Sequence, residues 1–477
     1  MRKLLIGLLI VGVLAAAALW AAQQGWLGTT KSESDKEYSG PDIESFRLSN
    51  GMEVVLVPNH RVPAISHTLW LNIGAADDPR GKSGLAHYLE HLMFKGTPNL
   101  PSGEFSRKIE KLGGNHNAFT GRDFTGYYVN IAREHLATVM EMEADRFQHL
   151  SIPADEWEKE REVIIEERRS RIDNRPAAML GEQMQATLFL HHPYRIPVIG
   201  WKHEMEALSL EDARKFYEYY YHPGNMLLVV AGDITRAELE PLAQQYYGVI
   251  PARKPAKRNW LSEPQAIAAR EVTLRHALVQ QPQWRRIYSA PSLVNGDTRH
   301  AMPLQALSYW LGDGKTSRLY QALVVEQKIA TSASAYYAGL SRGPSDFSIA
   351  ITPAPGVSMP QITQAVDALL QDIAAQPIDN HTLERAKTLL KASAIYARDG
   401  LQPIAQYVGY LRIIGADVSY FTKWPQLVDA ITAEQVQDAA RHVLRIEQSV
   451  TGYLLPPQDA APTQTQPQPA AQEAGDE

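Results

Sequence analysis

Residues 87–91 read His-Tyr-Leu-Glu-His, and this pentapeptide constrains the structure more than any other segment of the chain. Two histidines four residues apart lie on the same face of a helix, one turn from each other. Glu90 follows His87 by three residues and faces the same side. Both imidazoles can therefore reach one metal ion, with a carboxylate nearby to act as a base. The alternative is a solvent-facing helix with three polar residues, and a zinc site also needs a third protein ligand.

Composition limits the ligands that are available. The chain has no cysteine, which excludes disulfides, thiolate zinc sites, thiol nucleophiles and a lipid-modified N-terminal cysteine. A metal must therefore be held by His, Asp or Glu. The formal net charge of −6 argues against general nucleic-acid binding, so we expect no nucleic-acid partner.

The domain organisation follows from length and pattern. A chain of 477 residues is too long for one ordinary core. Helices and strands alternate without the regular βαβ spacing of a doubly wound sheet, which favours an α+β fold. We expect one domain at residues 42–250, a linker at 251–269, and a second domain at 270–455 that repeats the first in size and in its strand-then-helix order. Residues 456–477 are rich in Pro, Gln and Ala, which is typical of a disordered tail.

Local patterns predict the individual elements. In the first half, the turn signal Asn50-Gly51 predicts a hairpin within residues 46–57. Further strands are expected at 66–73, 124–131 and 227–231, and helices at 84–93, 102–112, 133–147 and 154–172. In the second half, strands are expected within 270–288, and helices at 301–311, 361–375, 380–397 and 433–444.

The N-terminus has the pattern of a targeting segment. A short basic start is followed by residues 4–22, which carry no charge and nearly span a hydrocarbon core. Leu19 and Trp20 interrupt the small residues that a cleavage site needs, which favours an uncleaved anchor over a cleaved signal. We expect residues 1–22 to be a signal or membrane anchor, followed by a linker at 23–41. Both interpretations export the rest of the chain, and we expect a periplasmic protein anchored in the inner membrane.

The expected helix at residues 154–172 supplies candidates for the third ligand. Glu160, Val163 and Glu167 lie on one stripe, because seven residues bring a helix back to within about 20°. Glu166 points elsewhere, roughly 120° away from Glu160. Such a helix can place two carboxylates in a partly buried site, and an ordinary solvated charged helix is the alternative.

These residues together resemble a known family. The order H-x-x-E-H, followed 76 positions later by Glu167, resembles the pitrilysin family of zinc peptidases, which includes insulysin and the mitochondrial processing peptidase. Glu160 matches a supporting glutamate that the family places seven residues before its ligand. The resemblance covers roughly residues 46–455 and is more specific in the first half. Other similar stretches are Gly113-Gly114-Asn115-His116-Asn117-Ala118-Phe119-Thr120, His192-Pro193-Tyr194 and Tyr220-Tyr221 with Gly232-Asp233.

The resemblance implies one Zn²⁺ per chain, held by His87, His91 and Glu167. Glu90 would take the proton of the attacking water, and Glu160 would support a ligand. It also implies two similar α/β-layer domains of the mitochondrial processing peptidase type, each an antiparallel-rich sheet packed by helices. The implied activity is endopeptidase hydrolysis of extended or unfolded peptides.

Residues 115–120 are implied to form an edge strand beside the zinc, to which a peptide would add as a further strand. Asn115, Asn117, Ala118 and Phe119 would then contact the substrate. The alternative is a Gly-Gly-Asn turn that leads into an ordinary strand.

Two tempting motifs are given little weight. His116 is a lone histidine, which is more often structural or exposed than a zinc ligand. Gly314-Lys315-Thr316 resembles the end of a phosphate loop, but the earlier glycine would fall at Tyr309, which excludes it.

The chain departs from the family pattern in its second half. Active members commonly place an Arg and a Tyr seven residues apart after Ser-Arg-Leu, and this chain has Val324 and Thr331 at those positions. That pair helps to hold the substrate and to stabilise the reacting carbonyl oxygen. We therefore expect a zinc-bearing subunit that needs a partner, either a homologous inactive chain or a second copy. The alternatives are a non-catalytic scaffold with the peptidase fold and a zinc-binding adaptor that presents extended peptides.

Overall fold

The computed structural model describes residues 42–258, 260, 262–397 and 400–458. The expected signal or anchor, the linker at 23–41 and nearly all of the expected tail lie outside these residues. Among the residues described, no helix combines the length and the apolar character that a membrane crossing requires.

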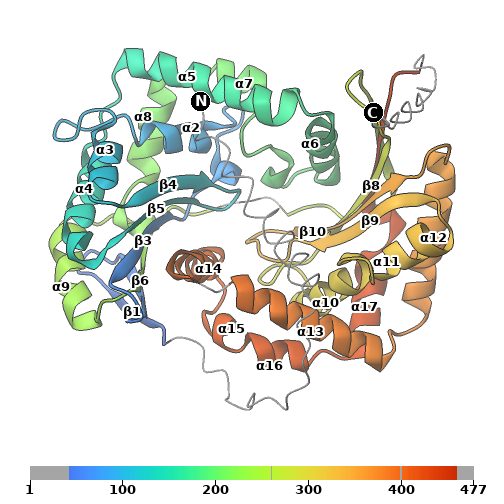
Figure 1. Ribbon diagram of the computed structural model, residues 1–477. Coiled ribbons are helices and arrows are strands. Elements are labelled where there is room, and N and C mark those ends of the chain that lie inside the picture. The colour runs from blue at the N-terminus through green and yellow to red at the C-terminus, as the bar shows by residue number, and fades with distance from the viewer. Residues whose placement is uncertain (1–41, 259, 261, 398–399, 459–477) are drawn as a thin grey trace, which may run out of the picture.

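Two sheets with helices packed on them form the two halves of the molecule (Figure 1). The strand order is β1-β2-β6-β3-β5-β4 in the first sheet and β7-β11-β8-β10-β9 in the second. In each sheet one pair is parallel, β2 with β6 and β7 with β11, and the other pairs are antiparallel. The α+β prediction, with two similar antiparallel-rich halves, is confirmed. The strands are β1 Glu44–Arg47, β2 Glu53–Pro58, β3 Ala64–Leu71, β4 Asn115–Thr120, β5 Thr125–Ala132, β6 Met226–Gly232, β7 Arg270–Arg275, β8 Gln283–Ala290, β9 Ala330–Tyr337, β10 Ser345–Pro353 and β11 Ser449–Leu455.

The helices expected from the sequence are present, with bounds that differ by a few residues at most. Helices that were not expected occur at residues 176–188, 202–206, 210–220, 236–246, 318–320, 401–414, 419–422 and 424–429. The segment expected at 154–172 is α5, continued by a π-helical turn, Arg169–Asp173. The first-half helices are α2 Leu85–Leu92, α3 Glu104–Lys111, α4 Leu136–His149, α5 Ala154–Arg168, α6 Pro176–Leu188, α7 Lys202–Glu206, α8 Leu210–Tyr220 and α9 Arg236–Tyr246. The second-half helices are α10 Ala301–Gly312, α11 Arg318–Tyr320, α12 Met359–Ala375, α13 Asn380–Ala397, α14 Leu401–Ile414, α15 Ser419–Thr422, α16 Trp424–Asp429 and α17 Ala433–Val443.

The internal duplication is plain in the strand order. The series β2-β6-β3-β5-β4 corresponds strand by strand to β7-β11-β8-β10-β9, with the same parallel pair at the same place. Within the described part of the chain, β1 has no counterpart in the second sheet. Topology therefore preserves a repeat that is not visible residue by residue.

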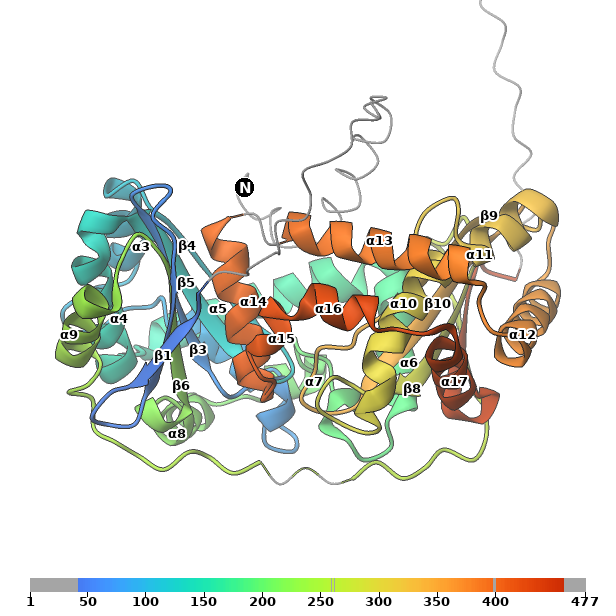
Figure 2. The same ribbon diagram turned by 90° about the horizontal axis from the view of Figure 1, so that it is seen from below.

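The two halves exchange a helix. The first-half helix α6 packs on β11, β7 and β8, whereas the second-half helix α14 packs on β6 and β3. Both views place α14 beside the first sheet (Figures 1 and 2). Leu180, Met184 and Leu188 of α6 share a buried cluster with Val450 and Leu454 of β11. Each half is thus covered partly by a helix from the other.

Glycines allow both exchanged helices to approach closely. A Cβ atom at Gly409 of α14 would lie 2.1 Å from Nε1 of Trp70 on β3. A Cβ atom at Gly452 of β11 would lie 2.2 Å from the sulfur of Met184 on α6. Neither contact could form with a larger residue unless its neighbour moved.

His67 on β3 makes folding stability depend on pH. Burial, with a smaller contribution from the charge of Arg146, lowers the pKa of His67 to about 3, and its Nε2 lies 2.9 Å from the hydroxyl of Tyr247. An unfolded histidine titrates near pH 6.5, so the unfolded chain gains a proton below that pH while the folded chain does not. The contribution of His67 to the free energy of unfolding is therefore complete above about pH 6.5. On acidification it falls by about 1.4 kcal/mol per pH unit until the pH approaches the folded-state pKa. Denaturant unfolding between pH 7.5 and 4.5 should show a shallower pH slope in His67→Gln, and an unchanged slope would contradict this assignment.

Candidate metal centre

Helix α2 is held at its N-terminus by a half-buried carboxylate. The backbone N–H groups of Gly84 and Ala86 donate to Oδ2 and Oδ1 of Asp78, each at 2.8 Å. Gly84 has φ 86°, and a Cβ there would lie 2.7 Å from the carbonyl oxygen of Ile199, so glycine is required. These contacts fix the start of the helix that carries His87, Glu90 and His91.

Helix α5 brings two carboxylates to these histidines. Oε2 of Glu167 lies 3.5 Å from Nε2 of His87 and 3.3 Å from Nε2 of His91. Oε1 of Glu160 lies 2.8 Å from Nδ1 of His91. The side chain of Glu166 is 67% exposed, in agreement with its expected direction away from this face.

The apolar residue on this face of α5 is Ile164. The sequence pattern suggested Val163, but that residue is 48% exposed, whereas Ile164 is fully buried. On an ideal helix Ile164 lies about 40° from Glu160, which is closer than Val163 at about 60°. The stripe that was expected is therefore rotated toward Ile164.

The site fits a zinc ion. One ligand atom from each of His87, His91 and Glu167 lies within 4.8 Å of the others, and no other such group occurs among the residues described. Ligands about 2.0–2.1 Å from a tetrahedral zinc are about 3.3–3.4 Å apart, close to the distances of 3.5 and 3.3 Å found here. Oε2 of Glu167 is buried and accepts no hydrogen bond within the described chain, so it is available to a metal. Two imidazoles and one carboxylate leave a fourth position for water or substrate.

The pKa values of the two histidines shift in opposite directions. Burial, with a contribution from His91, lowers the pKa of His87 to about 3, so this imidazole is neutral. Burial also opposes charge on His91, but the neighbouring carboxylates of Glu160 and Glu167 outweigh it and raise the pKa of His91 to about 9. For Glu167 the effect of burial is outweighed by the two histidines, and its pKa falls to about 2. Metal binding must therefore displace a proton from His91.

Two basic residues that were not expected from the sequence support the carboxylates. Nζ of Lys95 forms an ion pair with Oε2 of Glu160. The guanidinium of Arg171, in the π-helical turn after α5, lies 2.7 Å from Oε1 of Glu167. Lys95 and Arg171 each follow a proposed ligand by four residues, a spacing that brings side chains together on a helix and could have identified them.

Residues 115–120 form β4, which pairs with β5 and has no second partner among the described strands. Asn115 and Asn117 are exposed along this edge, and Phe119 packs edge-on against Trp70 with ring centroids 5.1 Å apart. The predicted edge strand is present and reaches the site, because Thr120 at its end donates to Oε2 of Glu90 at 2.5 Å. No local pattern could have identified this contact, since β4 and α2 are far apart in sequence.

His116 lies outside the metal group. Its ring packs against Phe94 and Phe105, with centroid distances of 5.4 and 5.3 Å. Burial and the charge of Arg146 lower its pKa to about 4, so it remains neutral near pH 7. Its position agrees with the structural role expected from the sequence.

The second half supplies no obvious catalytic group at the two positions that depart from the family pattern. Val324 is half-buried against the second core. Thr331 is exposed on β9, where its hydroxyl donates to the carbonyl oxygen of Thr352 at 3.3 Å. Neither side chain is cationic or phenolic.

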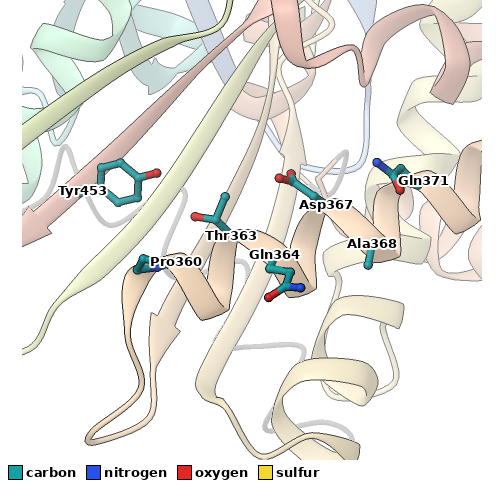
Figure 3. A pocket seen from close by; sticks show the side chains of 7 residues that line it. All are labelled: Pro360, Thr363, Gln364, Asp367, Ala368, Gln371 and Tyr453. Carbon is teal, nitrogen blue, oxygen red and sulfur yellow. The ribbon is translucent and has the colours of Figure 1, made fainter.

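A hollow of about 600 Å³ on the second half is separate from the metal group. It lies between α12 and β11, and Tyr453 faces Thr363 across it (Figure 3). Its one carboxylate, Asp367, forms an ion pair with Arg286. None of the candidate site residues lines this hollow.

Glu160→Gln is expected to weaken zinc binding about 10- to 100-fold, because the carboxylate orients His91 and favours the tautomer with Nε2 free. Competition with a chromophoric chelator measures the change. Glu166→Gln is a matched control on the same helix, exposed and outside the site, and should bind zinc as the wild type does. Equal zinc affinity in the two variants would show that Glu160 has no supporting role.

The chain is similar to known proteins over most of its length. The family model described as "Insulinase (Peptidase family M16)" matches residues 53–201, and the model described as "Peptidase M16 inactive domain" matches residues 207–390. The chain is 30% identical to zinc protease PqqE of Helicobacter pylori over 422 residues, covering 87% of this chain and 93% of that protein. It is 24% identical to the mitochondrial-processing peptidase subunit beta of Blastocladiella emersonii, covering 90% of this chain and 93% of that protein.

Solved structures show the same fold. A protease from Helicobacter pylori superposes with a TM-score of 0.81 at 29% identity, covering 87% of this chain and all of that one. The periplasmic protease PqqL from Escherichia coli gives a TM-score of 0.72 at 18% identity, and this chain covers 48% of its length. The fold and these similarities thus define a two-domain protein of the pitrilysin type. The chain belongs to peptidase family M16.

Proposed function

We propose that the protein is a zinc-dependent endopeptidase that hydrolyses extended or unfolded peptides. The observation that carries this proposal is the group of His87, His91 and Glu167, whose ligand atoms lie within 4.8 Å of one another beside Glu90 and the free edge of β4. The names of related proteins, among them zinc protease PqqE, support the same activity.

Each residue has a distinct role in this proposal. His87, His91 and Glu167 would hold the zinc ion, which supplies Lewis acidity that acidifies water and polarises a peptide carbonyl. Burial raises the pKa of Glu90, so this carboxylate takes a proton from water readily and can return it to the leaving amine. Glu160 accepts from Nδ1 of His91 and leaves Nε2 free as the ligand atom.

The edge of β4 would bind the substrate. An extended peptide can pair with its free backbone groups, and Asn115, Asn117, Ala118 and Phe119 would lie along that peptide. Backbone pairing depends little on side chains, so we expect broad selectivity for extended or unfolded segments.

A partner is also part of the proposal. Val324 and Thr331 provide no group that could grip a reacting carbonyl oxygen, and a related protein, the mitochondrial-processing peptidase subunit beta, is named as a subunit. We infer a homologous partner chain or a second copy. Export to the periplasm, with residues 4–22 as an inner-membrane anchor, is supported by the uncharged N-terminal run and by the description of PqqL as periplasmic.

Purification from the native envelope, followed by a peptide-cleavage assay, tests activity and partner together. We expect cleavage of an unfolded peptide by the co-purified complex, loss of cleavage with a chelator, and recovery when zinc is added. Robust cleavage by the isolated monomer would refute the need for a partner.

The second candidate function is a zinc-binding scaffold or peptide-presenting adaptor without catalysis. The observation that favours it is the match of residues 207–390 to an inactive-domain description. Zinc and peptide binding without cleavage by the intact complex would support this candidate.

A further inference from the structure

The proposed substrate strand and the proposed base meet at one side chain. Thr120 is the last residue of β4, and its hydroxyl lies 2.5 Å from Oε2 of Glu90 on α2. Oε1 of Glu90 forms no hydrogen bond with any part of the chain that the structure describes. One carboxylate oxygen is therefore held, and the other is available to a water molecule.

The backbone around Thr120 is anchored without help from Glu90. Thr120 pairs with Thr125 across the β4–β5 ladder. The next residue, Gly121, donates to the carbonyl of Phe124 at 2.8 Å and accepts from the N–H of Ala75 at 3.0 Å. The backbone that carries the Thr120 hydroxyl is thus held in place. Glu90 has a long side chain with several rotamers, so a contact is needed to keep its carboxylate in one position.

The proton of Thr120 is free for this contact. The neighbouring hydroxyl of Thr125 donates to the carbonyl of Ile73 at 3.2 Å and lies 3.5 Å from that of Thr120. The hydroxyl of Thr120 donates to the carboxylate of Glu90. Hydrogen bonds to charged groups are shorter and stronger than neutral ones, in agreement with the 2.5 Å separation.

We propose that Thr120 is a positioning residue that holds Oε2 of Glu90 and thereby aims Oε1 at the water to be deprotonated. This inference rests on the proposed peptidase function and deepens it. The same strand, β4, would then bind the peptide and hold the base. The position of Glu90 relative to the peptide is therefore fixed without further contacts.

Two variants separate the hydroxyl from the shape of the side chain. Thr120→Val keeps the shape and removes the donor, and we expect kcat to fall about tenfold while KM stays within about twofold. Thr120→Ser keeps the donor and should retain most of kcat. In a Glu90→Gln background, Thr120→Val should cause no comparable further loss, because the base that it positions is already absent.

Crystal structures and binding measurements give a readout that does not depend on cleavage. We expect Glu90 to occupy one position in the wild type and in Thr120→Ser, and several positions in Thr120→Val, with zinc and peptide affinities unchanged. An unmoved Glu90 together with wild-type kcat in Thr120→Val would overturn the inference. A wild-type complex that binds zinc and peptide but does not cleave would instead overturn the proposed function, and the position of Glu90 would still decide the role of Thr120.

Discussion

Glu90→Gln is expected to lower kcat by about a hundred- to ten-thousandfold, the usual contribution of a general acid–base group. Glutamine has nearly the same shape as glutamate, and its amide oxygen can still accept from Thr120. It cannot take a proton from water. Single-turnover cleavage of an unfolded peptide measures the loss.

Zinc and peptide affinities should stay near wild-type values in this variant, because Glu90 is not among the three ligands. Glu141→Gln, an exposed glutamate on α4, removes the same charge away from the site and should leave cleavage unchanged. Cleavage by Glu90→Gln at the wild-type rate would show that the base is another group.

Arg168→Met is expected to lower the free energy of unfolding by about 3–5 kcal/mol, the usual cost of breaking a buried ion pair from one side. Arg168 is the last residue of α5, and its two terminal nitrogens donate to the two carboxylate oxygens of Glu182 on α6, each at 2.9 Å. Both side chains are buried, with 7% and 8% exposed. Urea unfolding measures the loss.

A double-mutant cycle shows whether the loss comes from the unpaired charge. Glu182→Met alone should also destabilise strongly, whereas the double variant should recover much of the loss because no isolated buried charge remains. Arg169→Met is the matched control, since the neighbouring Arg169–Glu166 pair is exposed and should change stability by less than about 0.5 kcal/mol. If Arg168→Met changed the free energy of unfolding as little as Arg169→Met, the Arg168–Glu182 pair would have no such stabilising role.

The ion pair also links the metal centre to the second half. Helix α5 carries Glu160 and Glu167, and α6 packs on the second sheet. Loss of Arg168 should therefore disturb the site and the junction between the halves together.

Much of the fold could be predicted because local patterns were strong. The hairpin turn at Asn50-Gly51 and the long helices of the second half follow from turn chemistry and periodicity. Helices α6 and α14 were not among those expected, and their exchange could not be predicted either. An amphipathic helix reveals that one face is buried, but not which of two sheets will cover it.

The residues of the metal group could be predicted from the sequence because they lie on helices, where residue spacing determines which side chains share a face. His87, His91 and Glu167 needed only a shared face and one long-range contact between α2 and α5. Thr120 could not be found in this way, because its contact with Glu90 depends on how a strand ends beside a helix. Val163 was expected on the apolar face, and Ile164 is buried there instead. The orientation of a helix about its own axis is set by packing, which spacing alone does not determine.

The helix exchange has a consequence for how the protein is made. The last strand of the first sheet ends at Gly232, and α14 ends at Ile414, roughly 180 residues later. At a synthesis rate of about 5–20 residues per second, the apolar face around Val55, Trp70 and Val229 stays uncovered on the order of 10–40 s, until α14 has been synthesised. A nascent chain therefore carries an unfinished surface that only its own C-terminal part can close, so premature termination anywhere before α14 should leave an aggregation-prone product.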